Sequence, residues 1–558
     1  MADTPPNVLW VSMEDTSPRF GCYGNTRAST PNIDRLAGRG VRYPNACATA
    51  GVCAPSRNAV ITGCYQTRTG GHHMRTTHTN EDAPDIPTPY EGVPPHYVRA
   101  FTEFLRAEGY YCTNNEKTDY QFDPGGVAPV TVWDECHDGA HWRNRPDEET
   151  PFFSVFNPTQ THESGMWPDS GTGRDGVPAT DPDEVTVPDY LPDTDGVRAQ
   201  IARQYDNIAR SDERLGELLT QLEADGELAN TYVFVWSDHG EGLPRAKRTL
   251  YDSGINVPLI VAGPDLDEGA VRTAPVSLVD LAPTVLELTG ARRPPYLDGI
   301  PFLGDDPDIT EREYAFAARD RIDESYDMVR AVRTRRFKYV RNYYPENPRV
   351  QWVPYRTQGP AMSDLLELYR NDELTGPPAR LFGPRPPEEL YDVRADPDET
   401  TNLADDPAYR DVLVELRNRL DEWRDEYDDL GDEPEREMVE RMHPNRETRT
   451  TDRNVEGLRE TAPPVFVPNA AENPTREAVE RGEFSAPALL QLECSTQGAS
   501  IAYAVDTDPR SFDGHHRGWQ LYTEPIELPA GETTVYAKAV RYGYVESETR
   551  EATFVVTE

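Results

Sequence analysis

The stretch Val8-Leu9-Trp10-Val11-Ser12-Met13-Glu14-Asp15 decides the fold, because a short apolar run ends in two adjacent acids. Continuous apolar runs of this length, rich in valine and aromatic residues, are typical of strands buried on both faces of a mostly parallel sheet. Two later runs have the same form. Phe152–Phe156 precedes a loop that contains His162, and Tyr232–Trp236 precedes Ser237-Asp238-His239-Gly240. We therefore expect three central strands, each followed by polar residues.

Segments with a helical period separate or follow these strands. Apolar residues recur at a spacing close to 3.6 in 101–105, 198–224 and 278–288. Alternating strands and helices predict an α/β fold, with a mostly parallel central sheet sandwiched by helices. Because ligands gather beyond the carboxyl ends of the strands in such a sheet, we expect the three polar clusters to lie together.

The pattern changes in the second half of the chain. The segments 328–333 and 337–341 alternate between apolar and charged residues, which is typical of antiparallel strands. From about residue 487, short strand-like segments separated by turns predict a β-sandwich. In Ser495–Tyr503 and Tyr536–Ala539 this region resembles the immunoglobulin-like C-terminal module of chitobiase-type glycosidases.

A chain of 558 residues is too long for one hydrophobic core. We predict four parts in chain order: a catalytic α/β domain at 1–305, a smaller α+β subdomain at 306–430, a charged linker at 431–482 and the β-sandwich at 483–558.

The formal net charge of −42 argues against binding to nucleic acid or to anionic membranes through a basic face. The chain has no run of about 18 apolar residues, so the sequence predicts no transmembrane helix. The first residues lack the basic and apolar parts of a secretion signal, so we expect a cytoplasmic protein. Only four of the 56 cationic residues are lysine, which favours adaptation to high salt over an ordinary acidic surface. Seven cysteines without a CxxC pair indicate reduced thiols.

Cys53 begins a helical pattern of its own. Pro55 suits the first turn of a helix, and Gly63 can end it. Cys53 would then lie at the helix N-terminus, where free amides and the helix dipole favour an anion. Arg57, one turn further, can orient a nucleophile or bind a charged oxygen. Without its neighbours, Cys53 would be interpreted as a buried structural cysteine.

The neighbours change that interpretation. Gly51–Gly63 resembles the signature of the sulfatase family at every constrained position, and Cys-x-Pro-Ser-Arg at 53–57 matches the recognition sequence of the formylglycine-generating enzyme. The resemblance extends over about 5–410 and includes Thr30–Leu36 and Glu389–Leu403. It implies an alkaline phosphatase-like fold. It also implies that this maturation enzyme oxidises Cys53 to formylglycine, the nucleophile that attacks sulfate beside a divalent metal ion.

Two polar pairs resemble the metal ligands of the family. Glu14-Asp15 follows the first strand, where sulfatases have an acidic pair, and Asp238-His239 stands where they have the second pair. With Cys53 they would hold a hard divalent cation through oxygen ligands. Ca²⁺ is the expected ion, with Mg²⁺ or Mn²⁺ as alternatives because a histidine is present. The usual first residue is aspartate, so Glu14 departs from the family pattern.

The resemblance assigns sulfate binding or proton transfer to three further side chains. Lys117 resembles the lysine of the family's Gly-Lys-Trp-His segment, and Lys247 matches the lysine that precedes a Tyr-Asp pair. A lysine supplies a compact charge with rotatable donors. His162 matches the family histidine after the Phe-Phe strand, which would bind sulfate or protonate the leaving oxygen. At Asp119 the family usually has histidine, so one customary sulfate contact is missing or reversed in charge.

The substrate side of the pocket is less well defined by the sequence. His72, His73 and Arg75 can line it, or they can belong to a loop with solvated histidines. Arg245 and Arg248 are further candidates that no motif supports. Members acting on sulfated glycans, including N-sulfoglucosamine sulfohydrolase-like ones, resemble the chain most, so a small sulfated saccharide is the expected substrate. The alternatives are a phosphodiesterase or phosphonate monoester hydrolase of the same superfamily, and a non-catalytic carbohydrate-binding relative.

Overall fold

The computed structural model describes residues 5–74, 87–168, 180–307, 309–444, 458–470, 482–485, 488–512 and 514–557. The chain forms two compact units, each assembled from several segments. The first comprises Met1–Arg75, Val155–Gly290 and Leu297–Glu433, and the second comprises Thr76–Ser154, Ala291–Tyr296 and Pro434–Glu558. Within the described ranges, no helix combines the length and apolar character needed to cross a bilayer. The boundaries expected at 305, 430 and 482 stay predictions.

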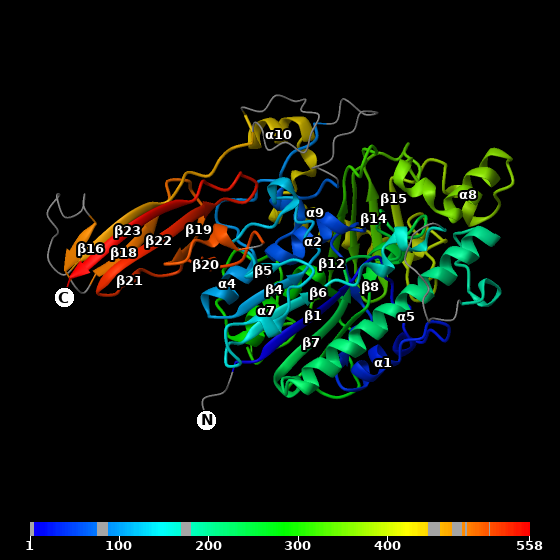
Figure 1. Ribbon diagram of the computed structural model, residues 1–558. Coiled ribbons are helices and arrows are strands. Elements are labelled where there is room, and N and C mark those ends of the chain that lie inside the picture. The colour runs from blue at the N-terminus through cyan, green and yellow to red at the C-terminus, as the bar shows by residue number, and fades with distance from the viewer. Residues whose placement is uncertain are drawn as a thin grey trace. The chain divides into compact units, whose positions relative to one another are not determined.

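A mixed sheet is the centre of the first unit (Figure 1). Up to β6, its strand order is β10-β2-β9-β7-β1-β6. The three strands expected from the apolar runs are confirmed as β1 (Asn7–Met13), β6 (Phe152–Phe156) and β7 (Thr231–Ser237). β1 pairs in parallel with β7, whereas β9 runs antiparallel to both of its neighbours. The remaining strands are β2 (Val41–Arg42), β9 (Leu259–Ala262) and β10 (Ala270–Val271).

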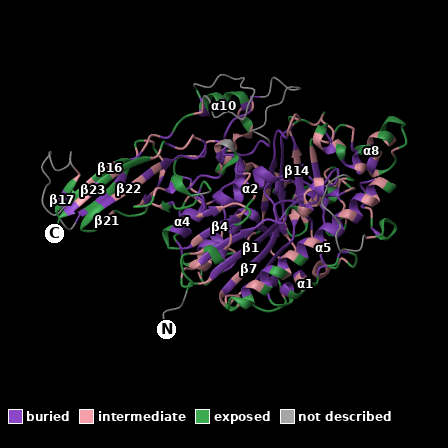
Figure 2. Cartoon of the chain, viewed as in Figure 1, coloured by how far each residue is buried: buried purple, intermediate pink, exposed green. Residues whose placement is uncertain are grey.

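Helices lie on both sides of this sheet, as the α/β pattern predicted. α1 (Pro31–Gly38) and α5 (Asp195–Ala224) pack against each other on one side. α2 (Cys53–Thr62) and α7 (Leu281–Thr289) pack together on the other. Figure 2 shows β1, β7 and α2 as buried, which explains why both strands are mostly apolar on both faces.

A second sheet in the first unit is antiparallel, with the order β12-β13-β14-β15. The alternating segments near 330 and 340 form two of its strands, as predicted. Helix α9 packs on it and buries Leu413, Leu416, Leu420 and Trp423. The bounds are β12 (Ala315–Arg319), β13 (Val329–Arg333), β14 (Phe337–Asn342), β15 (Glu388–Asp392), α8 (Pro360–Arg370) and α9 (Arg410–Glu426). Smaller elements are α3 (Gln66–Thr69), α6 (Asp252–Ile255), β3 (Ala46–Cys47), β8 (Asn256–Val257) and β11 (Val276–Ser277).

The second unit contains the predicted β-sandwich. Its sheets have the orders β16-β18-β21 and β17-β23-β22-β19-β20, and apolar side chains from both meet in one core. The strands are β16 (Val465–Ala470), β17 (Glu483–Ser485), β18 (Ala488–Glu493), β19 (Ser500–Val505), β20 (Gln520–Leu521), β21 (Ile526–Leu528), β22 (Gly531–Val540) and β23 (Arg550–Thr557). The unit also contains α4 (Phe101–Ala107), β4 (Tyr111–Asn115), β5 (Glu135–Cys136) and α10 (Glu435–Met442).

Candidate active site

The register of β1 and β7 brings two polar pairs to one edge of the sheet. Met13 lies opposite Ser237 in this parallel pair, so Glu14-Asp15 emerges beside Asp238-His239. The backbone N–H of Asp15 donates a hydrogen bond to Oδ1 of Asp238 over 3.3 Å. All four residues are buried. The sheet therefore places three carboxylates and an imidazole together, in a region where charges need partners.

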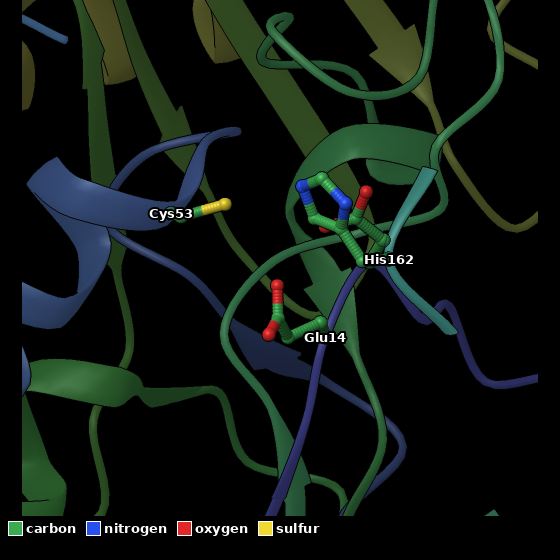
Figure 3. Close-up of side chains that lie close together, drawn as sticks. Glu14, Cys53 and His162 are labelled. Carbon is green, nitrogen blue, oxygen red and sulfur yellow. The ribbon is translucent and has the colours of Figure 1, made fainter. Parts of the chain in front are cut away.

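Cys53 faces this edge from the start of α2. Gly63 ends the helix with a φ of 63°, as the sequence predicted. The Ser56 hydroxyl donates to the backbone oxygen of Asp238 over 2.6 Å, and Sγ of Cys53 lies 3.3 Å from Nε2 of His239. Figure 3 shows the Cys53 side chain directed from the helix toward Glu14 and His162. A nucleophile formed at Cys53 would lie at the N-terminus of a helix, where free backbone N–H groups and the helix dipole stabilise negative charge.

The side chains around Cys53 suit a divalent cation. Ligand atoms of Glu14, Asp15, Cys53 and His162 lie within 4.8 Å of one another, and so do those of Cys53, Asp238 and His239. Nδ1 of His239 lies 2.9 Å from the backbone oxygen of Gly240 and donates to it, which leaves the Nε2 lone pair for a metal. That atom lies 3.1 Å from Oδ1 of Asp15.

Two acceptors that face each other at this distance need a positive charge between them, so the donor set fits a cation. A proton on His239 can supply that charge instead. Burial lowers the pKa of His239, but the charges of Asp238 and Asp15 outweigh burial and raise it to about 10.

Arg57 links the ends of β6 and β7 through hydrogen bonds. Its Nε donates to Oδ2 of Asp238 over 2.9 Å, and its Nη1 donates to Oδ1 of Asn157 over the same distance. Asn157 directly follows β6. Burial lowers the pKa of the Arg57 guanidinium, but the carboxylates of Asp238 and Glu14 raise it above its ordinary value. Arg57 therefore stays charged and orients Asp238.

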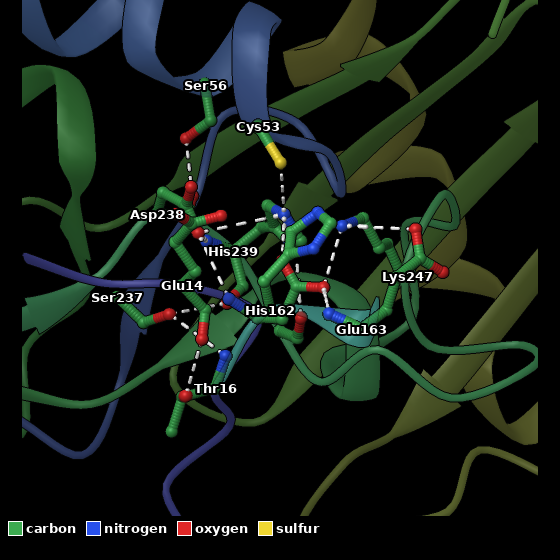
Figure 4. A network of polar contacts seen from close by, with 12 residues as sticks. Glu14, Thr16, Cys53, Ser56, His162, Glu163, Ser237, Asp238, His239 and Lys247 are labelled. Carbon is green, nitrogen blue, oxygen red and sulfur yellow. Dashed lines mark hydrogen bonds and ion pairs between the residues drawn. The ribbon is translucent and has the colours of Figure 1, made fainter. Parts of the chain in front are cut away.

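A second ion-pair network begins at Lys247 (Figure 4). Nζ of Lys247 lies 2.7 Å from Oδ2 of Asp15 and 3.3 Å from Oε1 of Glu163. Arg248 holds the same Glu163 with both terminal nitrogens, over 2.9 and 2.5 Å. Burial raises the pKa of Glu163, but Arg248 and Lys247 bring it well below its usual range. Burial likewise raises the pKa of Asp15, and Lys247 and His239 hold it well below the ordinary value.

The backbone at this network adopts conformations that non-glycine residues avoid. Asp15, Arg245 and Arg248 have φ angles of 46°, 63° and 75°. Each such residue costs about 1–3 kcal/mol, and such strain clusters at functional sites. Gly51 shows how tightly the loop packs, since a Cβ there would stand 2.2 Å from the backbone oxygen of Thr249. The strained loop thus fixes Lys247 and Arg248 beside the start of α2.

His162 and His239 have opposite tautomers. The backbone N–H of Ser164 donates to Nδ1 of His162 over 3.4 Å, and the Ser164 hydroxyl lies 2.8 Å from the same atom. The proton of a neutral His162 is therefore on Nε2, where it can be given to a leaving oxygen. A neutral His239 would instead keep its proton on Nδ1, which donates to Gly240, and offer Nε2 as a ligand.

Comparison with known proteins identifies the family of this site. The sulfatase family model matches residues 6–291. An ulvan-active sulfatase of Formosa agariphila is 37% identical over an alignment that covers 95% of this chain and 88% of that protein. This chain belongs to the sulfatase family. It is therefore a sulfuric ester hydrolase.

Human N-sulphoglucosamine sulphohydrolase is also similar to this sulfatase, at 30% identity over 75% of this chain and 90% of that protein. Among solved structures, the phosphonate monoester hydrolase of Agrobacterium radiobacter has the same fold. The TM-score is 0.55 at 17% identity, covering 76% of this chain and 96% of the other. The fold is thus shared with a hydrolase whose name refers to a different bond, so the fold alone does not select the substrate.

The other predicted site residues of the sulfatase are distributed between the two units. Met74 packs with Cys53 and Ile322 in one buried cluster, and His72 and His73 immediately precede it. Arg75 lies outside the described residues. Lys117 belongs to the second unit, where its Nζ lies 3.7 Å from Oδ2 of Asp119. The acid that replaces the customary histidine is therefore an ion-pair partner of the lysine.

Two residues of the sulfatase site, Glu163 and Asn157, belong to no motif that the sequence analysis identified. Asn157 follows a predicted central strand, as Glu14 and Asp238 do, and this position was a usable signal. Glu163 follows the predicted His162, but its role depends on the partners Lys247 and Arg248, about 85 positions away. Arg248, which lacked motif support, belongs to this network through its ion pair with Glu163.

Proposed function

We propose that this sulfatase removes a sulfate ester or N-sulfate from a saccharide, with Cys53 converted to formylglycine as its nucleophile. The printed names of two relatives support a carbohydrate substrate, because one acts on ulvan and the other on N-sulphoglucosamine. The observation that carries the proposal is the position of Cys53. Its Sγ stands 3.3 Å from His239, at a helix N-terminus that faces buried carboxylates.

Glu14, Asp15, Asp238 and His239 would hold the divalent ion, with Ca²⁺ as the first choice and Mg²⁺ or Mn²⁺ as alternatives. When bound, the ion supplies positive charge that acidifies the nucleophilic hydroxyl and polarises the sulfate oxygens. Formylglycine supplies that hydroxyl in its hydrated form. The formylglycine-generating enzyme would be the maturation partner that oxidises the thiol.

The remaining side chains manage charge and protons. Arg57 fixes Asp238, and Lys247 offers an ammonium donor beside Asp15, so both add positive charge where negative charge develops on the sulfate oxygens. His162 carries its proton on Nε2 and would give it to the leaving alcohol or amine. Sulfate binding by Lys117, which pairs with Asp119, stays a prediction from the family resemblance.

The test combines two measurements on protein made together with the maturation enzyme. Peptide mass spectrometry should show Cys53 with an aldehyde in place of the CH₂SH group. Sulfate release should then be measured on desalted sulfated mono- and disaccharides, and compared with hydrolysis of an aryl phosphate diester and a phosphonate monoester. Faster turnover of a sulfated saccharide supports the proposal. Faster turnover of the phosphorus esters, or equal sulfate release by protein with an unconverted thiol, refutes it.

A further inference from the structure

Three buried arginines lie in or next to the ion-pair network that begins at Lys247. Arg248 belongs to the strained loop, Arg319 ends β12, and Arg356 lies in the short 3-10 helix Pro354–Gln358. Their side chains are almost completely buried, and Arg356 is 6% exposed. Arginine is rarely buried unless its guanidinium is paired. Each of these three guanidinium groups therefore requires hydrogen-bond acceptors or a negative charge nearby.

Each of the three has a buried nitrogen for which the described part of the chain offers no acceptor. Arg248 uses both terminal nitrogens on Glu163, and its Nε makes no hydrogen bond, since Oδ2 of Asp323 lies 3.9 Å away. Arg319 donates to Oε1 of Gln351 over 2.7 Å, and its Nε is also left over. For Arg356 the buried Nη1 meets no acceptor among the described residues. An unsatisfied buried donor costs about 1–3 kcal/mol, so the group calls for an explanation.

Negative charge is also scarce around these arginines. Glu163 is shared by Lys247 and Arg248, and Asp327 is shared by Arg319 and Arg385. Asp323 adds one more carboxylate, whose Oδ2 lies 3.9 Å from Nε of Arg248. Arg356 is left without an ion pair to any described residue. Burial lowers the pKa of Arg356, and the repulsion of Arg248 and Arg319 adds to this, so that it falls to about 9. The side chain still carries its charge at neutral pH.

The surplus charge lies close to the reacting groups. The ring of Tyr355, next to Arg356 in the chain, is centred 6.3 Å from the imidazole of His162. Arg248 is linked to Lys247 through the shared Glu163, and Lys247 contacts Asp15 directly. A ligand bound at Arg248 would therefore be connected to Asp15 of the proposed cation site through three ion pairs, Arg248–Glu163, Glu163–Lys247 and Lys247–Asp15.

We propose that Arg356, with Arg248 and Arg319 beside it, forms a subsite for a second anionic group of the saccharide, a carboxylate or a further sulfate. This inference rests on the proposed function, because it assumes that the scissile sulfate lies at Cys53. The planar guanidinium fork matches both anions, which accept two parallel hydrogen bonds from it. The substrate would supply the acceptors and the charge that the described protein lacks.

The test measures binding without turnover. Cys53→Ala protein and the double variant with Arg356→Gln are titrated calorimetrically with three saccharides. One carries a single sulfate, one adds a carboxylate, and one adds a second sulfate instead. The preference for a doubly charged saccharide over the singly charged one should fall about 10- to 100-fold in the double variant, as expected for a lost charge-assisted hydrogen bond. The two doubly charged compounds show which anion the subsite takes.

Controls separate recognition from structure. Arg39→Gln removes an exposed arginine at the end of α1 and should keep the preference. Without ligand, Arg356→Gln should unfold at the same or a higher temperature, since it removes an unpaired buried charge. An unchanged preference, an equal loss of affinity for all three compounds, or a lower unfolding temperature overturns the inference. If the parent enzyme releases sulfate from no saccharide, the proposed function fails instead, and the calorimetric preference still tests the subsite.

Discussion

The polar end of the β1–β7 sheet and the core of the C-terminal sandwich bury opposite kinds of side chain. At the sheet end, Asp15, Asp238 and Lys247 are at most 1% exposed, and each is held by specific partners. In the sandwich, β18 alternates buried and exposed positions, and its buried side is apolar. Buried charges cost free energy even when they are paired, whereas buried apolar area stabilises the fold. The sheet end is therefore organised for chemistry, and the sandwich core for stability.

The largest contrast is expected at Cys53. Replacing Cys53 by alanine removes the group that becomes the nucleophile, so kcat/KM should fall by at least about 10⁴-fold while the unfolding temperature changes little. The measurement is sulfate release beside a thermal melt. Cys64→Ala is the matched control, because Cys64 is equally buried two residues beyond the end of α2. It should keep its activity. Substantial turnover by Cys53→Ala would remove the distinction between the two regions.

The sequence predicted the elements of the sheet end better than its contacts. The apolar runs before Glu14 and Asp238 predicted β1 and β7, and the Pro55 and Gly63 signals predicted both ends of α2. Local periodicity and capping determine such features, so one window of sequence is enough.

The ion-pair partners were not predictable in this way. Glu163 forms ion pairs with Lys247 and Arg248, which follow it by about 85 positions in the sequence. Arg356, which lies close enough to repel Arg248, follows Arg248 by more than 100 positions. Such pairings depend on how distant loops pack, and no short pattern encodes them. The salt adaptation expected from the scarcity of lysine stays a prediction. Lys247 and Lys338 are buried in ion pairs, which is a position where a compact ammonium is useful.

Glu163→Gln should affect both activity and stability, which no change in the sandwich core should do. The substitution leaves Arg248 without its carboxylate and removes one of the two anions that hold Lys247. Breaking a buried pair in this way costs about 3–5 kcal/mol of unfolding free energy, and sulfate release should also fall because Lys247 moves. Urea unfolding and kcat/KM measure the two effects.

Glu217→Gln is the control for Glu163→Gln, since it breaks the exposed Arg214–Glu217 pair on α5. It should cost less than about 1 kcal/mol. Equal costs for the two substitutions would mean that burial does not set the energetics of the site.

Leu490→Ala tests the sandwich side of the comparison. Leu490 is fully buried in the core between the two sheets, so the substitution should cost about 2–5 kcal/mol of unfolding free energy through lost burial and a cavity. The neighbouring Leu489→Ala, which truncates an exposed side chain on the other face of β18, should cost under about 0.5 kcal/mol. Both variants should keep the parent's kcat for sulfate release. A fall in kcat for Leu490→Ala would show that the two regions are not separate in function.

The smallest expected effect concerns His516, a buried titratable group in the second unit. Its Nε2 donates to the backbone oxygen of Ala128 over 2.7 Å, and burial lowers its pKa to about 3, with repulsion from His515 adding to the shift. The folded protein therefore binds a proton at His516 less readily than the unfolded chain, whose histidine has a pKa of about 6.5. The stability from neutral His516 is fully present above pH 6.5 and is lost as the pH falls, by about 1.4 kcal/mol per pH unit.

His516→Gln removes this contribution, so the variant should lose less stability than the parent between pH 6.5 and 4.5. Urea unfolding at both pH values gives the double difference, in which every other titrating group cancels. A parallel decline in the two proteins would mean that His516 accepts a proton in the folded state and that the second unit tolerates a buried charge as the sheet end does.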